Sequence, residues 1–346
     1  MVDGGPLVSV IVPCFNAAAT IRETLLSIMG QTYARMEIIV VDDGSSDGSA
    51  RIVEQLASTD RRIRLISQQN QGVAAARNAG ILASNGAHIA PIDADDLWAP
   101  DKLARQMEVF ELCGDRVGVV YTWYAQIDAQ SRVISLHHRP DDEGQVLGRI
   151  CRNNFVGNGS SAVMRKRLVE QVGGYDPGLR AQGGQGCEDW KLLLQLSAIC
   201  EFRVIPAHLT GYRSTGSNMS SDTLQMMRST ELVAADSAKE FPQHERALKA
   251  HVGDTMFGLF ERALLAGQHR ASAILLGKMF GHDPSRALFH LAELPERLVR
   301  QGAPRSVKRL AKSVSTLGKA TYDQPLFNAP DPAAANPPES GTYVSC

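Results

Sequence analysis

The sequence predicts an α/β fold in which a mostly parallel sheet is flanked by helices. Short continuous apolar runs, which are typical of strands covered on both faces, alternate with segments of helical periodicity through the first third of the chain. This rhythm indicates parallel strands joined by right-handed crossovers. Ligands on such sheets bind beyond the carboxyl ends of the strands, so the polar residues that follow each strand are the first candidates for a functional site.

The alternation fills a first half that we place at residues 1–115. Its strands are expected at Leu7–Val12, Glu37–Val41, Ile63–Ile66 and His88–Ile92. Its helices are expected at Ile21–Ile28, Ser46–Ala57, Gln71–Ala83 and Asp101–Leu112.

A second half is expected at residues 116–221. Its strands are predicted at Val117–Tyr124, Arg132–Leu136 and Gly157–Val163. The segment Asp176–Cys187 is rich in glycine and lacks periodicity, which indicates a mobile loop, and a helix is expected to follow at Trp190–Ile199.

Helical patterns dominate from about Leu224, so we expect a helical extension over residues 222–320, interrupted near Pro242, Pro284 and Pro304. Residues 321–346 are rich in proline, alanine and asparagine, a composition typical of a disordered tail.

Composition excludes several classes of protein. The net charge of −1 argues against general nucleic-acid binding, which needs a basic face. No run approaches the length of a membrane span, and the N-terminus does not resemble a signal peptide. The six cysteines form no C-x-x-C pair, which argues against a structural zinc site or a disulfide framework and favours a cytoplasmic location.

Two acidic segments follow predicted strands. In the run from Val40 to Asp47, two carboxylates end a buried strand, and Asp43 could accept a hydrogen bond from a nucleobase; the alternative is a turn in which Ser46 or Asp47 caps the next helix. The second segment, Asp93–Asp96, holds three carboxylates in four residues. Their repulsion calls for a cation such as Mg²⁺ or Mn²⁺, although a capping cluster before the next helix is an equal alternative.

Two further polar features are ambiguous when taken alone. Glu188 and Asp189 stand at the start of an apolar helix, where the helix dipole favours acidic residues for structural reasons. Arg77 interrupts an alanine-rich helix. It could be solvated, pair with Asp42 or Asp47, or reach a base or phosphate.

The ordered series of motifs is more specific than any member. V-S-V-I-V-P-C-F-N, V-V-D-D-G-S-S-D, N-x-G-x-A-x-A-R-N, D-A-D-D and E-D-W follow one another between Val8 and Trp190. In this order they resemble the family-2 glycosyltransferases, inverting enzymes with the GT-A fold. The resemblance covers roughly Leu7 to Ser221 and implies that residues 1–115 bind the nucleotide and residues 116–221 the acceptor.

The resemblance also implies a role for each matching residue. Asp95 would hold Mg²⁺ or Mn²⁺ on the donor's diphosphate, and Asp189 would be the general base, with Glu188 as the competing candidate. The implied substrate-binding residues are Pro13, Phe15, Asn16, Asp43, Arg77, Asp93, Glu188, Trp190 and Arg213. Among them, Asp43 and Arg77 would lie beside the base, and Asp93 near the ribose and donor sugar.

Two departures from the family pattern matter. The Q-x-x-R-W element and the membrane helices of processive members are missing, which favours transfer of a single sugar. The histidine of a common Y-R-x-H element is also missing from Tyr212–Thr215, so Arg213 is expected to take more of the diphosphate contact.

The expected function is transfer of one sugar from a nucleotide-sugar, with UDP preferred over GDP or dTDP, to the hydroxyl of a glycan or lipid-linked acceptor in cell-surface polysaccharide synthesis. A non-catalytic nucleotide-sugar-binding module is the main alternative. A dinucleotide-dependent oxidoreductase is a second alternative, but the chain lacks the G-x-G-x-x-G motif that such an enzyme has after its first strand. A nucleotidyltransferase is a third, but the chain also lacks the glycine- and lysine-rich phosphate loop of that class.

A basic segment could bring the protein to a membrane. Residues 297–319 hold seven lysines or arginines and no acidic residue, with apolar residues interspersed. This pattern fits either a solvated helix or a surface that rests on anionic lipid.

Overall fold

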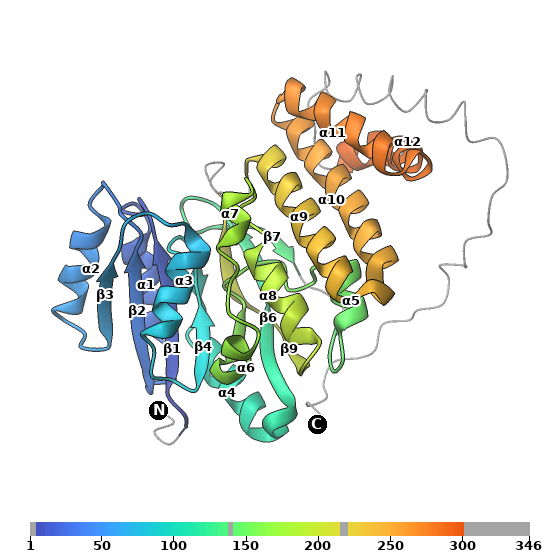
Figure 1. The fold of residues 1–346 in the computed structure, drawn as a ribbon. Coiled ribbons are helices and arrows are strands. Elements are labelled where there is room, and N and C mark those ends of the chain that lie inside the picture. The colour runs from blue at the N-terminus through green and yellow to red at the C-terminus, as the bar shows by residue number, and fades with distance from the viewer. Residues whose placement is uncertain (1–4, 138–140, 215–220, 301–346) are drawn as a thin grey trace. The chain divides into compact units, whose positions relative to one another are not determined.

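The computed structural model describes residues 5–137, 141–214 and 221–300 and divides the chain into two compact units, Met1–Leu248 and Lys249–Cys346 (Figure 1). The first unit therefore runs past residue 221, where we expected the catalytic domain to end. It includes a helix, α9 (Thr223–Glu240), that we had assigned to the extension.

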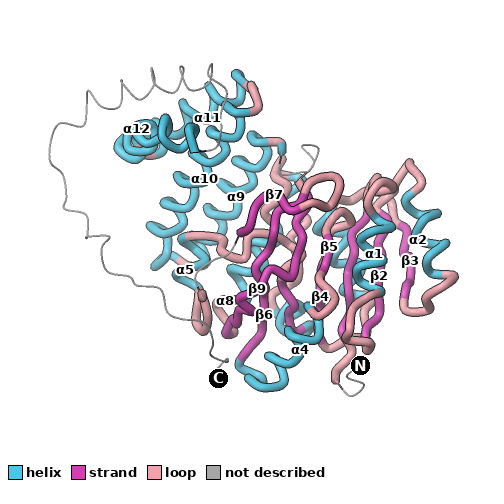
Figure 2. The backbone as a smooth tube through the Cα atoms, turned by 180° about the vertical axis from the view of Figure 1, so that it is seen from behind, coloured by secondary structure: helices cyan, strands magenta, loops and turns pink. Residues whose placement is uncertain are grey.

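One mixed nine-stranded sheet organises the first unit, in the order β3-β2-β1-β4-β8-β6-β9-β5, with β7 paired to β6 (Figure 2). Neighbours β3, β2, β1 and β4 run parallel, as the sequence predicted. Strand β8 is antiparallel to both β4 and β6. The strands are β1 (Val8–Cys14), β2 (Met36–Asp42), β3 (Ile63–Ser67), β4 (His88–Pro91), β5 (Leu97–Trp98), β6 (Val117–Ile127), β7 (Val133–His137), β8 (Ala162–Arg165) and β9 (Glu201–Arg213).

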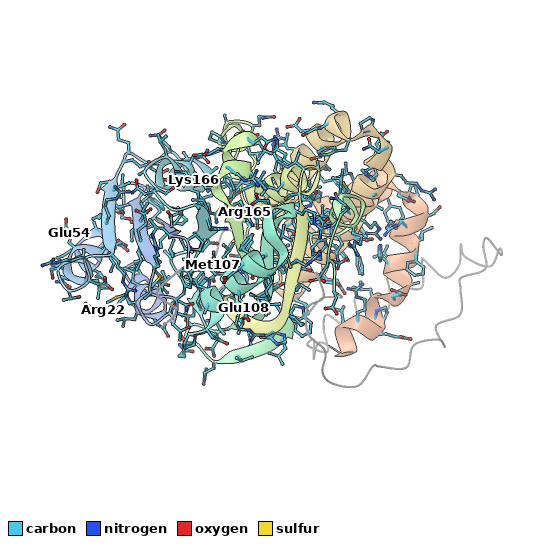
Figure 3. All side chains as sticks on the ribbon, turned by 90° about the horizontal axis from the view of Figure 1, so that it is seen from below. Arg22, Glu54, Met107, Glu108, Arg165 and Lys166 are labelled. Carbon is cyan, nitrogen blue, oxygen red and sulfur yellow. The ribbon has the colours of Figure 1, made fainter. Side chains whose placement is uncertain are left out.

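Helices cover both faces of this sheet (Figures 1 and 2). They are α1 (Ile21–Met29), α2 (Ser49–Ala57), α3 (Val73–Leu82), α4 (Lys102–Cys113), α5 (Leu147–Arg152), α6 (Lys166–Gln171), α7 (Gly178–Ala181), α8 (Glu188–Ser197) and α9. On α4, Met107 is buried in the core whereas its neighbour Glu108 is exposed (Figure 3).

The continuous apolar strands are explained by burial on both sides. Val10 and Val12 of β1 share one hydrophobic cluster with Leu25 of α1 and Leu103 of α4. The intervening Ile11 points to the opposite face, where α3 packs.

Helix α3 lies close to the sheet because Gly80 has no side chain. A Cβ atom at Gly80 would come within 2.6 Å of Ile11 Cγ2 and 3.3 Å of Val41 Cγ2. The alanine-rich helix therefore packs tightly over the parallel strands. This packing determines the positions of its polar residues, Arg77 and Asn78.

Three local predictions differ from the structure. The strand expected at Gly157–Val163 begins only at Ala162, because Gly157 has a φ of 81° and Asn158–Ser161 form a loop. The glycine-rich segment contains the short helix α7. The 13-residue strand β9 was not predicted; it lies between β6 and the short edge strand β5.

The second unit continues helix α10 (Glu245–Leu265) and contains α11 (His269–His282) and α12 (Pro284–Arg300). The breaks expected at two prolines are confirmed: Pro242 opens a 3₁₀ turn and Pro284 opens α12. The expected break at Pro304 and the expected tail lie outside the described residues. Among the described helices, none is long and apolar enough to span a bilayer.

Candidate active site

The polar segments that follow β1 and β2 are joined by hydrogen bonds. The Asn16 amide donates to Ser45 Oγ (2.9 Å), and Asn16 Oδ1 accepts from the Ser46 amide (2.9 Å). Asn16 has a φ of 49°, a conformation that asparagine tolerates better than most residues. Pro13 is buried at the end of β1, and the adjacent Phe15 is 53% exposed. An apolar ring is therefore available at the carboxyl edge of the parallel strands.

Asp43 is buried and organises the loop that leads into α3. Its carboxylate accepts from Gln68 Nε2 (2.7 Å) and from the amides of Gln71 (2.9 Å) and Gly72 (2.8 Å). Two carboxylate oxygens offer about four acceptor positions, so these bonds leave room for about one more. The structure thus gives Asp43 a role in the loop that the sequence did not indicate, beside its predicted contact with the base.

Arg77 joins three parts of the first unit. Its guanidinium is buried, and it pairs with Asp93 beyond β4 (2.5 Å) and with Glu188 at the start of α8 (3.0 Å). It also lies over the ring of Tyr175, 5.1 Å from the centroid. The charges of Asp93, Tyr175 and Glu188 raise the pKa of Arg77 despite the opposing effect of burial. The ion-pair partners are therefore Asp93 and Glu188 in place of the Asp42 or Asp47 that we had considered.

A loop that the sequence analysis missed completes this contact. A Cβ atom at Gly159 would lie 3.0 Å from Arg77 Nη2, so the absence of a side chain lets the loop approach the ion pair. Ser160 Oγ donates to Asp96 (2.5 Å) and accepts from the Asp93 amide (3.0 Å). The only sequence signal was the G-N-G-S-S run at 157–161, which we read as part of a strand.

The acidic turn after β4 brings three carboxyl groups, those of Asp93, Asp95 and Asp96, close together. Burial, with the charge of Asp93, raises the pKa of the half-buried Asp95 to about 6. Asp96 is fully buried, and burial with the charges of Asp95 and Asp93 raises its pKa well above the usual value. Of these three carboxylates, Asp93 pairs with the Arg77 guanidinium, and the positive charge of Arg213 partly offsets the rise in the pKa of Asp95.

This turn fits a hard divalent cation. Magnesium and manganese take one or two protein carboxylates and complete their shell with water and substrate phosphates. Asp95 suits that role because it is half-buried beside a second carboxylate, Asp93. Among the described residues, no preassembled group of three or more acidic, histidine or cysteine ligands surrounds it.

Arg213 lies beneath the acidic turn. Its amide donates to Asp96 Oδ1 (2.9 Å), and its Nε donates to the Asp95 carbonyl (2.6 Å). The guanidinium also binds the Asp128 carbonyl (3.0 Å) and pairs with Glu23 (2.9 Å), and the side chain is fully buried. Arg213 therefore supports the acidic turn through contacts within the protein. Its predicted contact with the diphosphate stays a prediction.

Glu188 and Asp189 are adjacent but have different surroundings. Glu188 is buried, and its carboxylate accepts hydrogen bonds from Arg77 and from the Gly186 amide (2.8 Å). Asp189 is half-buried and accepts one hydrogen bond, from the Trp190 amide (2.7 Å). Burial, followed by the charge of Glu188, raises the pKa of Asp189 to about 7. Of the two, Asp189 has the surroundings of a proton acceptor.

Trp190 points into the fold. Its indole is 2% exposed and donates to the Ile150 carbonyl of α5 (3.1 Å), which joins α8 to α5. The predicted contact with substrate stays a prediction.

The glycine-rich segment before these carboxylates is fastened to α9. The Gln185 amide donates to Ser229 Oγ (2.5 Å), and Arg228 Nε donates to the Gln182 carbonyl (2.8 Å). Helix α9 therefore supports the approach to Asp189, although we had expected this segment to be mobile.

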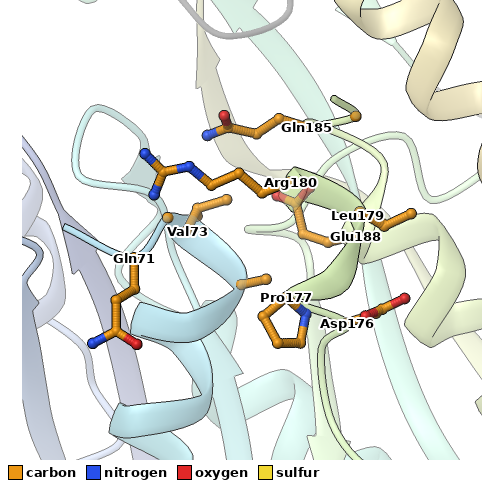
Figure 4. Close-up of a pocket in the computed structure, with 11 residues that line it drawn as sticks. Gln71, Val73, Asp176, Pro177, Leu179, Arg180, Gln185 and Glu188 are labelled. Atoms are coloured by element: carbon orange, nitrogen blue, oxygen red, sulfur yellow. The ribbon is translucent and has the colours of Figure 1, made fainter. Parts of the chain in front are cut away.

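A small pocket that opens to solvent lies between this segment and the start of α3 (Figure 4). Gln71, Gly72 and Val73 line it from one side, and Arg180 and Glu188 from the other. The pocket is thus lined both by the nucleotide half and by Glu188 at the start of α8.

Residues 9–173 match the family model for glycosyl transferase family 2. An uncharacterized glycosyltransferase of Nostoc sp. is 30% identical over 220 residues, which cover 61% of this chain and 66% of that protein. The chain thus spans just under two thirds of the length of this curated relative.

Solved structures show the same fold. S. aureus TarS 1–349, in complex with UDP-GlcNAc, matches with a TM-score of 0.62 at 16% identity and covers 92% of this chain and 93% of that chain. The mannosyltransferase PcManGT of Pyrobaculum calidifontis, in complex with GDP-Man and Mn²⁺, matches with a TM-score of 0.53 at 19% identity over 93% of this chain and 89% of that chain. The fold is the predicted GT-A fold with helices added at the C-terminal end, and residues 9–173 carry the similarity to glycosyl transferase family 2.

Proposed function

We propose that this protein is a metal-dependent, inverting glycosyltransferase that adds a single sugar from a nucleotide-sugar, preferably a UDP-sugar, to an acceptor hydroxyl. One observation carries the proposal. Arg77 pairs with both Asp93 and Glu188. Asp93 lies two residues before Asp95, and Glu188 lies directly before Asp189. The candidate metal-binding carboxylate and the candidate base therefore belong to one site.

The chemistry follows from the surroundings of each carboxylate. Asp189, ionised above a pKa of about 7, would accept the proton of the acceptor hydroxyl as its oxygen attacks the anomeric carbon. The bond from that carbon to the diphosphate oxygen breaks in the same displacement, which inverts the anomeric configuration. A divalent ion at Asp95 would neutralise the charge that the leaving diphosphate gains. Phe15 and Asp43 would contact the nucleobase.

The acceptor and location are proposed more broadly. We place the acceptor among glycans or lipid-linked saccharides of cell-surface polysaccharide synthesis. We place the protein in the cytoplasm, with peripheral contact to anionic lipid through residues 297–319.

A screen of UDP-, GDP- and dTDP-sugars by thermal shift with Mn²⁺ would find the donor, and NMR of the product would give its anomeric configuration. An axial donor sugar should yield an equatorial product. Retention of configuration would contradict the inverting mechanism. Donor binding without turnover, either to acceptor or to water, would favour the binding-module alternative.

A further inference from the structure

The pocket between α3 and α7 contains a cation that the proposed mechanism does not use. Arg180 of α7 lines this pocket and is exposed. Its side chain makes no ion pair or hydrogen bond with any of the residues that the structure describes. Figure 4 shows it extending over Val73, with its guanidinium turned away from Glu188 and Asp176.

Neighbouring acids do not compensate this charge. Asp176 is paired with Lys191 (2.6 Å), and Glu188 is paired with Arg77 (3.0 Å). Both acidic residues that line the pocket therefore already have their own cations, and Arg180 remains as surplus positive charge at the pocket's edge.

The direction of Arg180 is fixed by a glycine. A Cβ atom at Gly72 would lie 2.9 Å from Arg180 Cδ and 3.1 Å from Nη1, so the arginine lies directly on the Gly72 backbone. Gly72 has a φ of 92°, which also favours glycine, and its amide is held by Asp43. Arg180 therefore crosses from the acceptor half to the loop that Asp43 anchors at the carboxyl edge of the sheet.

The other arginine that we expected to reach a diphosphate is committed elsewhere. Arg213 is fully buried and bound to the Asp95 and Asp128 carbonyls and to Glu23. Guanidinium groups bind phosphate oxygens through paired N–H donors, and Arg180 is placed to present such donors.

We propose that Arg180 binds the diphosphate of the nucleotide donor and closes the pocket over it from the acceptor half. The inference rests on the proposed function, because it requires a nucleoside diphosphate to enter this site. Phosphate oxygens of an acceptor have the same chemistry, so the test must distinguish the two sources.

Calorimetry with UDP, GDP and dTDP in the presence of Mn²⁺ would identify which diphosphate the wild-type protein binds. Arg180→Gln should weaken that binding about tenfold, or about 1.4 kcal/mol. Binding of the same nucleoside without phosphates should change less than about twofold, since no charged hydrogen bond is lost. Arg180→Lys should lie between Arg180→Gln and the wild type, because it keeps the charge and loses the paired donors.

Arg61→Gln is a matched control, because Arg61 is also an exposed arginine. It lies just before β3, at the amino ends of the parallel strands, whereas Arg180 lies at their carboxyl ends. It should bind as the wild type does, and equal melting temperatures would confirm that all variants fold. Unchanged diphosphate affinity in Arg180→Gln, or an equal loss with the bare nucleoside, would overturn the inference. An effect confined to the KM of the acceptor would also overturn it. If the wild type binds none of the three diphosphates, the proposed function itself fails.

Discussion

Arg77 Nη1 lies 3.0 Å from the Glu188 carboxylate, and this contact joins helix α3 of the nucleotide half to the start of helix α8. Since Nη2 of the same guanidinium is paired with Asp93, removal of Arg77 would leave two carboxylates without their counter-ion. The cluster therefore depends on one buried cation.

Arg77→Met keeps much of the side-chain bulk and removes the charge. We expect it to lower the free energy of unfolding by about 3–5 kcal/mol, as when one partner of a buried ion pair is removed. Urea unfolding measures this loss. Arg105→Met is the control, since Arg105 makes an exposed pair with Asp101 at 3.6 Å, and it should cost less than about 1 kcal/mol. Equal losses in the two variants would mean that the Arg77 pairs contribute little.

Asp189→Asn keeps the hydrogen bond to the Trp190 amide and removes the proton acceptor. Donor binding should persist while turnover falls by roughly 10²–10⁴-fold, the usual contribution of a general base. Steady-state kinetics and donor calorimetry separate the two effects. Glu188→Gln is the paired variant, and its main effect should be on stability, because Glu188 binds Arg77 and the Gly186 amide. If only Glu188→Gln abolished transfer, the base would be Glu188.

The raised pKa of Asp189 also predicts a dependence of stability on pH. Its pKa is about 7 in the folded protein, whereas its ordinary value is 3.8, so the unfolded chain loses this proton more readily. Ionisation of Asp189 therefore destabilises the folded state, and the loss develops as pH rises from about 4 to 7. Asp189→Asn should raise the melting temperature at pH 8 by about 2–4 °C and by less at pH 4, which calorimetry can measure. An equal shift at both values would point to a cause other than ionisation.

Asp95→Asn tests the metal assignment with little change of shape. Because it removes one charge from a crowded acidic turn, the protein should stay folded and become no less stable, while Mn²⁺-dependent turnover falls at least about tenfold. Activity titrated with Mn²⁺ and with a chelator measures this loss. Asp101→Asn, at a half-exposed aspartate before α4, should respond to Mn²⁺ as the wild type does. Wild-type activity that persists in chelator would remove the metal from the mechanism.

Deletion of residues 301–346 removes five of the seven basic residues of the segment 297–319. We expect binding to vesicles that contain phosphatidylglycerol to weaken, because less positive charge faces the lipid, and the wild-type binding to fade as salt rises. Co-sedimentation measures both, with neutral phosphatidylcholine vesicles as the control. Unchanged binding after the deletion would locate any lipid contact elsewhere in the chain.

The sequence by itself determined the parallel half of the fold. Buried apolar runs such as Val8–Val12 and Ile38–Val41 can be covered on both faces only in a sheet flanked by helices, and the period of each segment is encoded locally. The same alternation located Asp43, Asp93 and Asp95 at strand ends, because the carboxyl ends of parallel strands meet at one edge.

Only the tertiary structure decided which charges meet. Arg77 is 111 residues from Glu188, and Gly159 and Ser160 reach the acidic turn from a loop with no distinctive local pattern. The structure gives the two neighbouring carboxylates different surroundings. Glu188 forms an ion pair, whereas burial raises the pKa of Asp189 to about 7. Arg213 is buried and bound within the protein, whereas Arg180 is exposed and lies against Gly72. Periodicity describes a residue's own element, whereas solvation and charge pairing depend on which distant segments fold against it.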